Sequence, residues 1–152
     1  MLDTADDLQQ RMVSLSSFID TFLLGIRNTS DDQGLAAIRG AVEDHHRFVA
    51  RVMGVLDGTT DQHIRAADLS TADSCRLGKW QGCVSDPVLR GRATFKAIVA
   101  PHRQVHDLGR QALELWEAGD KTGAREAASG MKDASKQVFA MLADLEREAQ
   151  GA

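Results

Sequence analysis

The sequence is poor in aromatic residues. Phe and Trp together make up 5% of the 152 residues, and there is no Tyr. A core with so few rings must be built mainly from Leu, Val, Ile, Ala and Met, which suits helix packing better than a β-sandwich. Hydrophobic residues at 43% and charged residues at 26% are otherwise ordinary for a globular protein, and the length suits one domain. We therefore expect residues 1–152 to form a single, mainly helical domain.

The sequence also lacks the features that accompany membranes, export or nucleic acid. No apolar run approaches the ~20 residues that a membrane span needs. No basic block stands out in a chain whose net charge is −4. The N-terminus carries Asp3, Asp6 and Asp7, whereas a secretory signal begins with basic residues. These absences predict a soluble, cytoplasmic protein with neither a membrane nor a nucleic acid as partner.

Cysteine is scarce as well, with only Cys75 and Cys83. In a reducing cytosol, two cysteines are expected as thiols or thiolates, although oxidation could join them in a disulfide. A chain of this length can bury a sizeable core, so it needs no such bridge to fold.

Apolar residues recur at alternating steps of three and four along four long segments, which is the spacing of a helix with one buried face. The segments are about 5–28, 32–57, 101–118 and 121–149. The face of the second segment contains Leu35, Ile38, Val42, His45, Val49, Val52 and Leu56.

The residues between the second and third segments are less regular. A short helix is expected near 62–69, and Asp86-Pro87 signals the start of another helix. This helix should end before Pro101, because proline disfavours helical geometry in the preceding residue. The sequence therefore predicts an all-α fold, an antiparallel four-helix bundle with a short helical or loop insertion between helices 2 and 3.

Three histidines lie on the predicted buried faces. His102 and His106 are four residues apart on one helix, so their side chains project from the same side and can reach one metal ion. Two histidines at this spacing are by themselves weak evidence for a metal site, because both could be core histidines with hydrogen-bond partners. His45 lies in phase with the apolar residues of another helix, and burying a third imidazole is costly unless it finds a partner. A shared metal ion is the interpretation that accounts for all three.

Cys75 is the natural fourth ligand, because a thiolate with three neutral imidazoles makes a closed tetrahedral set suited to zinc. Alternatively, Cys75 is a small buried apolar residue. His46 is one step off the buried face and His63 lies in the weakly patterned region, so both are expected outside the site. An exchange of His45 for His46 as ligand stays open.

The segments Asp44-His45, Cys75-Arg76-Leu77-Gly78-Lys79-Trp80 and Pro101-His102-Arg103-Gln104-Val105-His106 closely resemble the chemoreceptor zinc-binding domain, abbreviated CZB. The resemblance covers roughly residues 35–146, which leaves residues 1–30 as an additional heptad helix. It implies a helical bundle that binds Zn²⁺ through His45, Cys75, His102 and His106. It also implies bacterial cytoplasmic signalling with a chemoreceptor or diguanylate cyclase as partner, and the ability to form dimers. In this family the proposed signal is zinc itself or oxidation of the zinc-bound cysteine by hypochlorous acid.

A sensory or regulatory role is favoured over catalysis, because four protein ligands leave no open position for water on the metal. A zinc-dependent hydrolase and a bundle with purely structural zinc are the alternatives. A di-iron bundle is disfavoured because such sites need inward carboxylates, and the predicted buried faces carry none. We also expect a homodimer, because one bundle is not expected to cover every apolar flank of the first helix.

Overall fold

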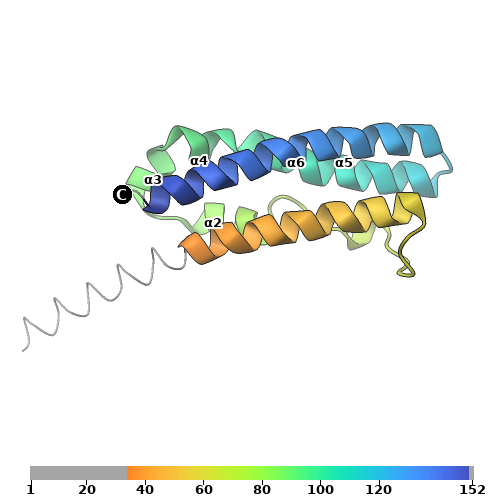
Figure 1. Cartoon of the computed structure of the whole chain (residues 1–152), viewed down its shortest axis with the longest axis horizontal. Coiled ribbons are helices and arrows are strands. Elements are labelled where there is room, and N and C mark those ends of the chain that lie inside the picture. Colours follow the sequence, from red (N-terminus) through yellow and green to blue (C-terminus); the bar gives the residue numbers. More distant parts are fainter. Residues whose placement is uncertain (1–33, 151–152) are drawn as a thin grey trace, which may run out of the picture. The chain divides into compact units, whose positions relative to one another are not determined.

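The computed structural model describes residues 34–150, in which every regular element is helical. The long elements are helix 34–57, α5 (Val99–Glu117) and α6 (Lys121–Gln150). The shorter elements that link helix 34–57 to α5 are η1 (Ala66–Asp68), α2 (Arg76–Cys83), α3 (Pro87–Gly91) and α4 (Ala93–Ala97) (Figure 1). The predicted all-α class and the insertion are confirmed, while the predicted helix 5–28 lies outside the described residues. No described helix is long and apolar enough to cross a membrane.

Glycine and aspartate set the ends of the long helices. Gly58 and Gly119 follow helix 34–57 and α5 with φ values of 67° and 90°, a left-handed conformation that glycine adopts without strain. The carboxylate of Asp120 then accepts a hydrogen bond from the backbone N–H of Gly123 at 2.9 Å, which caps the first turn of α6. The short turn between α5 and α6 makes them an antiparallel pair (Figure 1).

Side-chain contacts show how helix 34–57 lies against this pair. Its contacts with α6 run in opposite directions along the two helices: Arg39 with Glu146, His46 with Phe139, and Leu56 with Arg125. Its contacts with α5 run in the same direction: His45 with His102, and Phe48 with His106. Helix 34–57 is therefore antiparallel to α6 and parallel to α5.

This parallel arrangement follows from the middle of the chain. Residues 58–98 return along the bundle before α5 begins (Figure 1). The described residues thus form a helical bundle, but the predicted antiparallel four-helix arrangement is not confirmed.

Among the described residues, local differences from the predicted elements lie in this middle segment and at the start of α5. The helix expected near 62–69 is only the 3-10 turn of η1, and the helix expected from Pro87 to Pro101 is divided into α3 and α4. Pro101 lies in the first turn of α5 instead of starting it. Proline is tolerated there, because the first N–H groups of a helix have no intrahelical acceptor.

The core is aliphatic, as the scarcity of aromatic residues predicts. Its fully buried larger side chains come from all three long helices and from the middle segment. They are Ile38, Val52, Leu77, Ile98, Val105, Leu113, Met131, Val138, Leu142 and Leu145. The three long helices therefore pack through apolar side chains that do not depend on a metal.

Candidate metal centre

Four side chains from three parts of the fold meet inside the bundle. His45 comes from helix 34–57, Cys75 immediately precedes α2, and His102 and His106 lie one turn apart on α5. One donor atom from each residue lies within 4.8 Å of the donor atoms of the other three. The histidines are only 2%, 2% and 1% exposed, and Cys75 is partly buried. The structure thus brings together the four residues that the sequence suggests as ligands.

Hydrogen bonds to backbone carbonyls orient two of the imidazoles. Nδ1 of His45 lies 2.7 Å from the carbonyl oxygen of Ala41, and Nδ1 of His106 lies 2.8 Å from that of Ser70. A carbonyl oxygen can only accept, so each Nδ1 donates its proton and each Nε2 keeps its lone pair. Both Nε2 atoms are buried and have no hydrogen-bond partner. Because buried polar atoms are rarely left without a partner, these two nitrogens fit a bound cation.

The chain around Cys75 folds tightly to place the sulfur. Cys75 is the N-cap of α2, and its Sγ accepts a hydrogen bond from the backbone N–H of Gly78 at 3.4 Å. The same Sγ lies 3.1 Å from Nε2 of His102. A Cβ atom at position 78 would overlap the carbonyl oxygen of Ala72. Only glycine allows the two backbone segments to approach this closely, so the spacing Cys-x-x-Gly is a structural requirement here.

Burial controls the charge of the cluster. Desolvation, assisted by the neighbouring histidines, lowers the pKa of His102 to about 3. Desolvation likewise lowers the pKa of His106 to about 4, against the opposing hydrogen bond to Ser70, and it lowers the pKa of His45. The imidazoles are therefore neutral at physiological pH, which is the form that binds metal. Burial raises the pKa of the Cys75 thiol, so a metal would have to displace its proton.

The dimensions of the cluster fit one tetrahedral ion. Zn–N bonds of about 2.0–2.1 Å and a Zn–S bond of about 2.3 Å place neighbouring donors roughly 3.3–3.6 Å apart. The pair Cys75 Sγ and His102 Nε2, at 3.1 Å, is already this close. The widest separation between donor atoms in the cluster is at most 4.8 Å, so all four lie within reach of one common ion.

The remaining residues of interest lie elsewhere. His46 is exposed, and its ring stacks on Phe139 of α6 with centroids 4.1 Å apart. Cys83 is an exposed free thiol at the end of α2. Trp80 packs edge-on against Phe95 of α4, with ring centroids 5.6 Å apart, and so joins α2 to α4.

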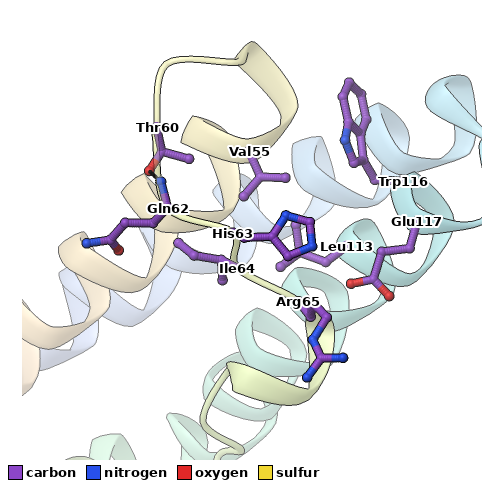
Figure 2. Close-up of a pocket in the computed structure, with 9 residues that line it drawn as sticks. All are labelled: Val55, Thr60, Gln62, His63, Ile64, Arg65, Leu113, Trp116 and Glu117. Carbon is purple, nitrogen blue, oxygen red and sulfur yellow. Dashed lines mark hydrogen bonds between the residues drawn. The ribbon is translucent and has the colours of Figure 1, made fainter.

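His63 lines a separate cavity of about 390 Å³ where helix 34–57 and α5 end. Figure 2 shows its imidazole above Leu113, with Trp116 and Glu117 of α5 to one side. Glu117 is already engaged there, because it accepts a hydrogen bond from the backbone N–H of Ala66 at 3.1 Å. None of the four residues of the metal cluster lines this cavity.

No curated protein and no solved structure matches the chain. A family model does match it, over the stretch that begins at the first histidine of the cluster. Residues 45–113 match the chemoreceptor zinc-binding (CZB) domain. The match contains all four cluster residues, and the resemblance predicted from the sequence is confirmed. CZB domains bind zinc, as their name says, so the prediction of zinc as the cofactor is confirmed at the level of the family.

Proposed function

We propose that this chain holds one zinc ion through Nε2 of His45, His102 and His106 and Sγ of Cys75. The observation that carries the proposal is the convergence of four donor atoms, two of them buried nitrogens with no hydrogen-bond partner. When bound, zinc would supply a positive charge that replaces the thiol proton of Cys75 and joins three parts of the fold. Three neutral imidazoles and one thiolate would leave the centre with a net charge of about +1.

We infer a regulatory role for this centre and not an enzymatic one. Four protein ligands fill a zinc tetrahedron, whereas catalytic zinc keeps a position for water or substrate. The CZB family match also favours signalling, because the family takes its name from chemoreceptors. A bacterial chemotaxis or cyclic-di-GMP pathway is the setting that we propose, with a chemoreceptor or a diguanylate cyclase as partner.

Zinc availability and oxidation of Cys75 are the two candidate signals. As a residue, Cys75 is less buried than the three histidines, and it is the member of the cluster that an oxidant can modify most readily. Oxidation would turn a soft anionic ligand into a poorer one, and the remaining histidines would hold zinc less tightly. The segment that carries Cys75 would then be released from the long helices.

The zinc site can be tested by elemental analysis of gently purified protein and by zinc titration after treatment with a chelator. We expect one zinc per chain, and the same stoichiometry on reloading. Well under half a zinc per chain, with no uptake when zinc is added, would contradict the proposal. Light scattering of the same samples tests the proposed homodimer, which a monomer mass at tens of micromolar protein would rule out.

A further inference from the structure

We propose that Arg76 is a positioning residue that holds Cys75 in the cluster and slows the release of the metal. This inference rests on the proposed zinc site. Arg76 follows Cys75 in the chain, and Asp44 precedes His45, so each is the direct neighbour of a cluster residue. Nε of Arg76 lies 3.1 Å from Oδ2 of Asp44. This ion pair joins the first residue of α2 to helix 34–57 immediately beside the cluster.

A glycine on helix 34–57 makes room for this arginine. Gly40 lies one turn before Asp44, and a Cβ atom there would overlap Nη1 of Arg76 and lie 2.9 Å from its Cζ. The guanidinium therefore lies against the helix backbone, and a larger residue at position 40 would displace it. Glycine in the interior of a helix destabilises it relative to alanine, so Gly40 is costly to the helix but leaves room for Arg76.

The position of Cys75 is the part of the cluster that such a contact can control. The three histidines are fixed on long helices that pack through the apolar core, whereas Cys75 precedes a helix of eight residues. A second ion pair on this segment, between Arg103 and Asp73 at 3.8 Å, is more exposed than the pair with Asp44. Ion pairs at half-exposed sites add little to overall stability. Instead, we expect such a pair to reduce how often the Cys75 segment moves away from the three histidines and allows the metal to leave.

The test is the rate at which zinc-loaded protein transfers zinc to an excess of a chelating dye. Arg76→Ala and Gly40→Ala should both release zinc faster than wild type, by about two- to fivefold for a contact of this exposure. Zinc content should stay at one per chain, because all four ligands remain. Arg47→Ala is the matched control, since Arg47 is a second partner of Asp44, at 3.8 Å, but lies on the same helix as Asp44.

Gly40→Ala separates the effect of the Arg76 position from an effect on folding stability. Alanine favours the helix, so this variant should unfold at a higher temperature than wild type and yet release zinc faster. Added salt should also accelerate release from wild type toward the Arg76→Ala rate, with little effect on Arg76→Ala itself. Wild-type rates in Arg76→Ala, or slower release in Gly40→Ala, would overturn the role of Arg76 and leave the zinc site standing. A wild-type protein that binds no zinc would overturn both.

Discussion

Adjacent histidines on helix 34–57 allow a sharp test of the metal centre. His45 lies in the cluster and is 2% exposed, whereas His46 is exposed and stacks on Phe139. We predict that His45→Ala loses most of its zinc affinity and that His46→Ala keeps it. The two substitutions are chemically identical and occur one residue apart on the same helix, so they differ only in what the imidazole contacts.

The expected size of the loss follows from the ligand count. Zinc sites of the closed kind contribute about 10–16 kcal/mol, or roughly 2.5–4 kcal/mol for each of four ligands. Each 1.4 kcal/mol is a factor of ten in affinity, so His45→Ala should raise the dissociation constant by about 100- to 1000-fold. His46→Ala removes an aromatic contact worth ~1 kcal/mol of folding stability and should change the dissociation constant by less than about threefold.

Competition against a chelator of known affinity measures both constants, and circular dichroism checks that both variants remain helical. Alanine is a strong helix former and the apolar core is untouched, so helix content should be preserved. Zinc affinity in His45→Ala equal to that of wild type would refute the site as described. A loss confined to His46→Ala would assign the ligand to the neighbouring histidine.

Three further predictions follow from the same geometry. Gly78→Ala should displace the chain before α2 and weaken zinc binding while most of the helix content remains, as chelator competition and circular dichroism would show; undiminished affinity would contradict the close approach. Hypochlorous acid should release zinc as Cys75 is oxidised, in wild type and in Cys83→Ser alike; a zinc-sensitive dye and mass spectrometry that find oxidation only at methionine or Cys83, with zinc retained, would disprove this. In metal-free folded protein, the pKa values of His102 (about 3) and His106 (about 4) lie below the usual 6.5. Between about pH 4 and pH 6.5, the unfolded chain therefore binds more protons than the folded chain. The free energy of unfolding is therefore highest above about pH 6.5 and decreases as the pH falls toward 4. The urea midpoint should be lower at pH 5 than at pH 7, and equal midpoints would count against the buried neutral imidazoles.

Periodicity in the sequence predicted the three described long helices well and their arrangement poorly. The spacing of Ile38, His45 and Val52 marks one face of helix 34–57, and the structure buries all three. Such a pattern says which residues face the core, but it does not say in which direction a neighbouring helix runs. The direction depends on how residues 58–98 cross the bundle, and this segment has no regular pattern from which its path could be predicted.

The candidate site likewise contains residues that the sequence could predict and residues that it could not. The histidines could be proposed from their phase with apolar neighbours, whereas Cys75 depended on its chemistry and on the family motif. The carbonyl oxygens of Ala41 and Ser70 were missed, because every residue offers a carbonyl and only the fold selects which one meets an imidazole. Gly78 was visible in the motif that follows Cys75, but its role in the close approach to Ala72 became apparent only in the structure.

The elements differ in whether they contribute to the metal cluster, and this difference indicates which of them a change at the metal would move. The buried side chains of α6 are apolar apart from Ser135, and α6 contributes no residue to the cluster, so its packing against α5 and helix 34–57 does not require a metal. The segment before α2 is different, because two of its attachments to the long helices lie at the cluster itself, namely Cys75 and the Ser70 carbonyl that meets His106, and a third is the Asp73 ion pair with Arg103. Loss of zinc should therefore leave the three long helices packed and alter the position of α2. We therefore expect a partner that responds to the state of the metal to contact α2 and the segment that leads into it.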